Sequence, residues 1–311
     1  MDLFDFEVGV RELRHVALNC PYIRRILIEK PSHEVTLESF LEFLRSCPAL
    51  EIGIFRGVIG HLITQEALVF LASCCKLRCL EVDARLIRPV LERIQETRGF
   101  AALECLGVQI EAPAVASLLR LFDGSHSLLR QLSLQIRGSP GWYSLQPFRA
   151  APSQLNNIVL EFPQDTVLSA ETLKFLQRFP QAKHLKITGT RGARVQSPDF
   201  TDAHFAEIVR GMHELEGLDL KVQCHLTVQS LAALSRHCRS LKEVFLPPAF
   251  NFNFHPLTNP SPFPEDDVWF PWLNCFGFGG FNPSPTPHHA GHMSLFNRYC
   301  CYFPLSYMSF L

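Results

Sequence analysis

Two kinds of segment are missing from this chain of 311 residues: a long apolar run and a block of like charges. No stretch of about 18 uncharged apolar residues occurs, so no membrane-spanning helix is expected. The acidic start, at residues 1–7, lacks the basic and then apolar pattern of a secretory signal. A formal net charge of -1 argues against nucleic acid as the main partner, because phosphate neutralisation needs clustered Lys and Arg. We expect a cytoplasmic or nuclear protein that binds neither membrane nor nucleic acid.

Motifs of common enzyme chemistry are lacking too. The chain contains no Gly-x-Ser-x-Gly, no phosphate-binding loop and no dinucleotide fingerprint. The glycine cluster at 277–280 lacks a following Lys-Ser/Thr, which indicates a turn, and the carboxylates of 265–267 are typical of a solvated loop. We therefore expect no catalytic residue, no cofactor and no enzymatic activity.

What the chain does have is a repeat. The pattern apolar-x-x-apolar-x-apolar occurs nine times, for example as LRCLEV at 77–82, and a tenth copy, Leu50/Ile52/Ile54, is one residue short. The ten copies begin at residues 23, 50, 77, 103, 129, 155, 182, 215, 241 and 273, so most intervals are 26 or 27 residues and two are 33 and 32. A fixed period of this length indicates a solenoid of stacked repeats.

Segments with helical spacing lie between the apolar triplets. Phe40, Leu41 and Leu44 share one face of such a segment, and so do Leu231 and Leu234. Each unit is thus predicted to be a short strand, a turn and a helix that returns the chain to the next strand. Stacking such units predicts an α/β leucine-rich-repeat solenoid, or horseshoe, of about ten repeats of 26–27 residues, with a parallel inner sheet and outer helices.

Cysteine recurs at one position of the repeat. Cys20, Cys47, Cys74 and Cys238 each stand three residues before a triplet, at the end of the returning helix. We expect reduced, buried thiols that pack the corner between helix and strand. Nucleophile or metal roles are disfavoured, because equivalent sites stay a full repeat apart.

One further cluster was considered for metal binding, in a Pro-rich stretch near the end of the chain. Its members are His288, His289, His292, Cys300 and Cys301. Their spacing fits no two-plus-two ligand pattern, so no metal site is predicted.

The units of the form helix-Cys-x-x-Leu-x-x-Leu-x-Leu resemble the cysteine-containing, RNI-like leucine-rich repeats of F-box proteins, in the style of fungal members. Residues 200–220 and 231–241 carry the likeness, which covers roughly residues 8 to 248. In the first of these stretches Thr201 or Asp202 is expected to serve as the helix N-cap. The resemblance implies a protein-binding solenoid that acts as the substrate-recognition part of a Skp–cullin–F-box ubiquitin ligase.

The F-box itself, a helical segment that normally precedes the repeats and binds the Skp adaptor, is not expected within this chain. Leu13 and Cys20 correspond in phase to Leu231 and Cys238, so the chain starts inside the first repeat's helix. A Skp-type adaptor is expected as a partner only if an F-box lies upstream. The alternative is a stand-alone leucine-rich-repeat scaffold or inhibitor with no ubiquitin ligase role.

Three segments are predicted: the solenoid over 1–248, a Pro-rich loop with a terminal repeat strand over 249–281, and an irregular, disordered tail over 282–311. The insertion at 189–198 is expected to form a loop that projects from the rim.

In each strand the residues between the triplet positions should point to the concave face, where a protein substrate would bind. The strand-central outward positions are Arg25, Leu27, Cys79, Glu81, Cys105, Gln131, Ser133, Asn157, Val159, His184, Lys186, Asp219, Glu243 and Phe245. Of these, the predicted protein-binding residues are His184, Lys186, Asp219, Glu243 and Phe245.

Overall fold

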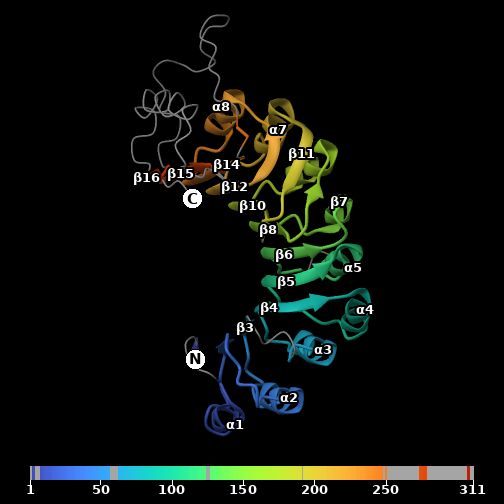
Figure 1. The fold of residues 1–311 in the computed structure, drawn as a ribbon. Coiled ribbons are helices and arrows are strands. Elements are labelled where there is room, and N and C mark those ends of the chain that lie inside the picture. The colour runs from blue at the N-terminus through green and yellow to red at the C-terminus, as the bar shows by residue number, and fades with distance from the viewer. Residues whose placement is uncertain are drawn as a thin grey trace, which may run out of the picture. The chain divides into compact units, whose positions relative to one another are not determined.

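A computed structural model describes residues 2–3, 8–56, 62–123, 127–190, 192–247, 249–250, 273–278 and 307–308, with the backbone alone at 2–3, 277–278 and 307–308. The chain divides into two compact units. Unit 1 consists of Met1–Gly138 and Ala150–Pro152, and unit 2 of Ser139–Arg149 and Ser153–Leu311. In both units parallel strands alternate with helices, which confirms the predicted α/β leucine-rich-repeat fold (Figure 1).

Unit 1 contains parallel strands whose order in the sheet is their order in the sequence. They are β1 Asp2–Leu3, β2 Arg25–Ile28, β3 Ile52–Phe55, β4 Cys79–Leu86, β5 Cys105–Glu111 and β6 Gln131–Arg137. The helices are α1 Val10–Asn19, α2 Leu37–Arg45, α3 Gln65–Ser73, α4 Arg88–Glu96 and α5 Val115–Arg120, and a 3₁₀ turn, η2 Ala112–Ala114, precedes α5. Helices α2 to α5 lie on one side of the strands (Figure 1).

The core of unit 1 is a stack of equivalent residues from successive repeats. Leu80 pairs with Leu106, and Leu106 with Leu132, and each side chain is at most 1% exposed. The helices complete the core, and Phe40 and Leu44 of α2 are buried in the same way. Burial of each such side chain contributes about 1.5–3 kcal/mol, and a repeat obtains it only from its neighbours.

The repeat at residue 50 differs from the predicted triplet. In β3 it is Gly53 and Phe55 that pair with the core residues Ile26 and Ile28, while Ile52 and Ile54 lie on the opposite face. The pattern is therefore of normal length, with a glycine at its central apolar position. A methyl group at Gly53 would lie 2.9 Å from Cε2 of Phe55, so the fully buried phenyl ring fills the space that the glycine leaves.

Unit 2 contains two parallel sheets. In the first, the strand order is β8 Asn157–Phe162, β10 His184–Gly189, β12 Gly217–Leu220, β14 Glu243–Leu246, β15 Cys275–Phe278 and β16 Tyr307–Met308. In the second, the order is β13 Val222–His225, β11 Val195–Thr201, β9 Thr166–Val167 and β7 Gly141–Trp142. The helical elements are η3 Gln146–Ala150, α6 Ala170–Leu173, η4 Lys174–Arg178, α7 Asp202–Val209 and α8 Val228–His237.

The second sheet corrects the prediction of a projecting loop at 189–198. Val195–Thr201 forms β11, which pairs with β9 on one side and β13 on the other. The extra residues therefore belong to the stacked repeats and do not project from them. The segment that follows the inner strand in one repeat lies beside the same segment of the next repeat, and their backbones pair. Val195 and Phe200 are buried within it.

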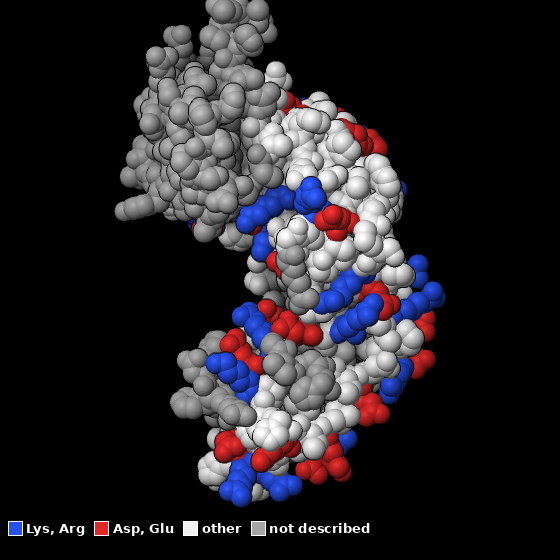
Figure 2. All heavy atoms as spheres, viewed as in Figure 1, with Lys and Arg blue, Asp and Glu red and all other residues white. Residues whose placement is uncertain are grey.

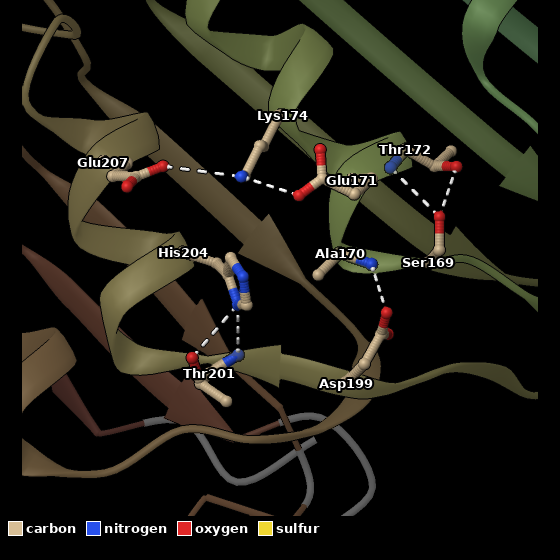
Figure 3. Close-up of polar contacts among 9 residues, drawn as sticks. All are labelled: Ser169, Ala170, Glu171, Thr172, Lys174, Asp199, Thr201, His204 and Glu207. Carbon is tan, nitrogen blue, oxygen red and sulfur yellow. Dashed lines mark hydrogen bonds and ion pairs between the residues drawn. The ribbon is translucent and has the colours of Figure 1, made fainter.

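Aspartates tie successive repeats of unit 2 together through their helix starts. Asp199 Oδ2 accepts a hydrogen bond from the backbone N–H of Ala170, the first residue of α6, at 3.0 Å (Figure 3). Thr201 is the N-cap of α7, and His204 Nδ1 accepts from its backbone N–H at 3.3 Å. Of the two N-cap candidates the structure therefore selects Thr201.

The other candidate, Asp202, stabilises the helix of the following repeat. Its Oδ1 accepts from the backbone N–H of Thr227 at 2.8 Å, and its Oδ2 from the Thr227 hydroxyl at 2.7 Å. Thr227 is the N-cap of α8, and the buried Ser230 hydroxyl also donates to Asp202 Oδ1. One carboxylate thus fixes the first turn of the next helix.

The corner cysteines follow the prediction in part. Cys47 and Cys238 are buried and Cys74 is half-buried, but Cys20 is exposed. Cys20 ends α1, the first helix of the described residues, so no earlier described helix packs over its thiol. Burial raises the pKa of Cys47 to about 11, as expected for an inert packing thiol.

The segment after residue 250 is described only in part. The terminal repeat strand predicted at Leu273 is present as β15, and Leu273 and Phe276 are buried. The carboxylates of 265–267, the His and Cys cluster at 288–301 and, apart from β16, the tail at 282–311 lie outside the described residues. None of the described helices combines the length and hydrophobicity that crossing a lipid bilayer requires.

Candidate functional site

The predicted binding residues lie on one face of the first sheet of unit 2. We call this the open face, because its side chains point away from the buried triplet residues. It consists of Asn157, Val159, Glu161, His184, Lys186, Gly217, Asp219, Lys221, Glu243 and Phe245. Strands β8, β10, β12 and β14 supply all of these residues except Lys221, which follows β12 directly.

The register of the sheet arranges the predicted residues in two rows. One row runs from His184 through Gly217 to Glu243. The other consists of Lys186, Asp219 and Phe245 on the same three strands. Residues from three different repeats are thus direct neighbours, as the regular repeat period predicted.

Gly217 gives the first row its shape. A methyl group at this position would lie 2.6 Å from Nδ1 of His184, so the imidazole leans over β12 into space that any other residue would occupy. His184 and Glu243 are both exposed. This row presents a ring and a carboxylate to solvent on either side of a glycine.

In the second row a lysine and an aspartate are followed by an aromatic ring, and two charged residues beside the row, Glu161 and Lys221, pair with them. Lys186 Nζ lies 2.9 Å from Glu161 Oε1. Lys221 Nζ lies 4.0 Å from Asp219 Oδ2 and 6.0 Å from the centroid of the Phe245 ring. The ring is half-buried, and a cation at this distance is attracted by its face.

Asp219 is the unsatisfied member of the row. Its Oδ1 atom is buried and has no hydrogen-bond partner among the described residues, while its side chain is 20% exposed. Burial raises the pKa of this carboxyl above its ordinary value, although Lys221 and Lys186 act in the opposite direction. A buried acceptor without a donor costs about 1–3 kcal/mol, while the exposed part of the same carboxylate stays open to a donor from a partner.

Sequence reasoning missed three members of the open face: Gly217, which has no side chain to signal it, and the charged residues Glu161 and Lys221. Glu161 and Lys221 lie two residues after the outward positions Val159 and Asp219 respectively, and therefore point to the same side. The period of two was the available signal, but only the central positions of each strand were considered.

A second charge pattern, also missed, runs along the edge where the strands begin. The residue after the first apolar position is charged in eight of the ten repeats and alternates in sign within each unit, and we call these eight residues the charge ladder; Asn156 and Asn274 are the neutral exceptions. In unit 1 its members are Arg24, Glu51, Arg78, Glu104 and Arg130, and in unit 2 they are Lys183, Glu216 and Lys242.

Ion pairs form between neighbouring members of the ladder. Arg78 donates to both carboxylate oxygens of Glu104, at 2.8 and 2.9 Å. Glu216 lies between Lys183, at 3.6 Å, and Lys242, whose hydrogen bond lowers the pKa of that carboxyl. On the face in view in Figure 2, acidic and basic side chains are likewise interspersed.

The outward positions of unit 1 give a less uniform surface. Leu27 is an exception to the prediction, because only 3% of it is exposed. Arg56 and Glu81 form a bidentate ion pair, with Nη2 at 2.8 and 2.9 Å from the two carboxylate oxygens. No row of mixed charge and aromatic character comparable to that of unit 2 is found among the described residues of unit 1.

Comparisons with known proteins add little to this picture. No protein-family model and no curated protein matches the chain. Among solved structures, the complex of Rad7 and Elc1 from yeast is similar at 13% sequence identity, over 89% of this chain and 76% of that chain, with a TM-score of 0.45. A likeness at this level assigns no partner or activity, so function must be argued from the open face.

Proposed function

We propose that this protein is a binding module without enzymatic activity, and that the open face of unit 2 holds a segment of a partner protein. The observation that carries the proposal is the partly exposed carboxylate of Asp219, which is flanked by Lys186 and Lys221 and lies on the strand next to the half-buried ring of Phe245. A carboxylate that accepts a donor, next to an aromatic ring that offers apolar area, is typical of the anchor of a protein interface.

The arrangement favours a partner side chain with a donor and an apolar stem, such as lysine, arginine or tyrosine. Its donor would pair with Asp219 and its stem would cover Phe245. His184 and Glu243, in the exposed row, would contact the flanking residues of the same segment. Such contacts at the edge of an interface contribute more to specificity than to affinity.

The test compares proteins captured by the wild-type chain, by Phe245→Ala and by Asp219→Ala, with Gln229→Ala on the exposed surface of α8 as the matched control. A purified partner should bind the Phe245→Ala variant about 30-fold more weakly, which corresponds to an anchor worth about 2 kcal/mol. Equal affinity for wild type and both open-face variants would refute the proposal.

The finer proposal is that the bound segment belongs to a substrate of an F-box-type ubiquitin ligase. The repeat resemblance, and in particular the buried corner cysteines Cys47 and Cys238, supports it. The test is co-purification of the product of the complete transcript with a Skp-type adaptor. If that product binds its partner and no adaptor, the stand-alone scaffold is the correct reading.

A further inference from the structure

Two thiols face each other on the sheet of unit 1, in a place that the binding function does not use. Cys79 of β4 and Cys105 of β5 are register partners on adjacent parallel strands, and both are half-buried. Both occupy predicted outward positions, so they differ from the corner cysteines that pack the core. With Arg78, Glu104, Arg130 and Gln131 they line a depression of about 240 Å³.

We propose that Cys79 and Cys105 form a two-thiolate site for a soft monovalent metal ion, with copper(I) as the natural candidate. Soft thiolate ligands select copper(I), zinc and iron–sulfur clusters among biological metals. The described residues contain no group of three or more His, Cys, Asp and Glu that could hold a metal. Protein zinc sites use three or four protein ligands and iron–sulfur clusters four, so a pair of thiols is too few for either, whereas two-coordinate binding is open to copper(I).

The spacing of the strands favours a metal bridge over a disulfide. Neighbouring strands lie about 4.8 Å apart, and the Cβ atoms of register partners are separated by a similar distance. A disulfide needs Cβ atoms about 3.5–4.5 Å apart, so it would have to pull the two strands together. A bridging metal ion lets the two sulfur atoms stay well beyond the S–S bond length of about 2.0 Å, so it asks for less approach of the strands than a disulfide does.

The surroundings suit the charge of such a site. Binding replaces two S–H protons by one monovalent ion, so two protons are released and the two thiolates and the ion together carry one negative charge. The contact between the two thiols lowers the pKa of Cys79 and, together with burial, raises the pKa of Cys105, so Cys79 is the thiol that gives up its proton first. Glu81 is held by Arg56 through both oxygens, and Glu104, which lines the depression, is held by Arg78 in the same way.

The experiment titrates the reduced full-length chain with copper(I) under nitrogen, against a chromophoric copper(I) chelator. Wild type should take one tightly held equivalent that Cys79→Ser and Cys105→Ser both lose. The affinity for that equivalent should fall at least about 100-fold, because even outer partners of a metal site are worth about 10- to 100-fold. Cys20→Ser and Cys75→Ser, at exposed thiols elsewhere in unit 1, are the matched controls and should retain it.

Two results would overturn the proposal. One is an unchanged tight equivalent in either single variant. The other is an additive loss of copper(I) affinity, in which the double variant Cys79→Ser/Cys105→Ser binds more weakly than either single variant. One shared site requires both thiols at once, so loss of either thiol should already have the full effect. Circular dichroism of each variant shows whether it is folded, and silver(I), which undergoes no redox change here, serves as the second probe and should give the same stoichiometry.

Discussion

Substitution of Asp202 tests whether the helix-start network holds unit 2 together. Asp202→Ala removes the acceptor of three donors: the backbone N–H and the hydroxyl of Thr227, and the hydroxyl of Ser230. A hydrogen bond to a charged group contributes about 1.5–3 kcal/mol, but the three share one carboxylate and do not add in full. The Ser230 hydroxyl, which is 0% exposed, is also left without its acceptor. We expect a loss of about 3 kcal/mol in the free energy of unfolding.

The assay is urea unfolding followed by circular dichroism, with hydrogen exchange of the α8 amides as the local measurement. Asp199→Ala is the matched control, because Asp199 accepts only one bond of ordinary length, 3.0 Å from Ala170, and a weak one of 3.5 Å from the equally buried Ser197 hydroxyl. It should cost about 1 kcal/mol. The double variant Asp202→Ala/Ser230→Ala should be more stable than Asp202→Ala alone, since it removes the stranded hydroxyl. If Asp202→Ala costs no more than Asp199→Ala, the reasoning is wrong.

Three further predictions concern single sites. Asp219→Asn should raise the free energy of unfolding by about 1 kcal/mol at pH 7, because burial disfavours the charged carboxyl. Because the pKa of Asp219 is raised in the folded state, wild-type stability falls as the pH rises from the ordinary value of 3.8 through the folded pKa. The stability gained by Asp219→Asn should therefore vanish below pH 3.8. Urea unfolding at several pH values measures this difference in stability, and a difference independent of pH would contradict the prediction. Gly53→Ala should destabilise unit 1 by about 1 kcal/mol, because its methyl group meets the ring of Phe55, whereas Gly211→Ala meets nothing within 4 Å and should be neutral in the same melting assay. Iodoacetamide at pH 8 should alkylate the exposed Cys20 and Cys75 at least about 10-fold faster than Cys47, whose pKa burial raises to about 11; peptide mass spectrometry would show any inversion of this order.

The repeat period allowed most of the inner strands to be predicted from the sequence. Leu77, Leu80 and Val82 are all at most 2% exposed, as a period-two strand with one buried face requires. Gly53 and Phe55 escaped prediction because a glycine is not recognised as apolar, although a ring two residues later fills its place. The strand β11 was missed because its partners, β9 and β13, become adjacent only when the repeats stack.

For the candidate site, the sequence predicted which residues lie on the open face but not which of their polar atoms are paired. The rows on β10, β12 and β14 follow from the period alone, and all five predicted residues lie in them. Asp219 Oδ1 remains unpaired because Lys186 forms its ion pair with Glu161 and not with Asp219. That choice is a matter of distances across strands, which no sequence pattern contains.

The charge ladder also restricts how such a chain can change its number of repeats. Removal of a single internal repeat, for example the one that contains Arg78, would place Glu51 beside Glu104 and set two like charges against each other. Removal of two consecutive repeats, for example those that contain Glu51 and Arg78, leaves Arg24 beside Glu104 and keeps the alternation of charge. In unit 1, loss of two repeats thus keeps opposite charges adjacent along this exposed edge, whereas loss of one repeat sets like charges side by side, at a cost of up to about 1 kcal/mol.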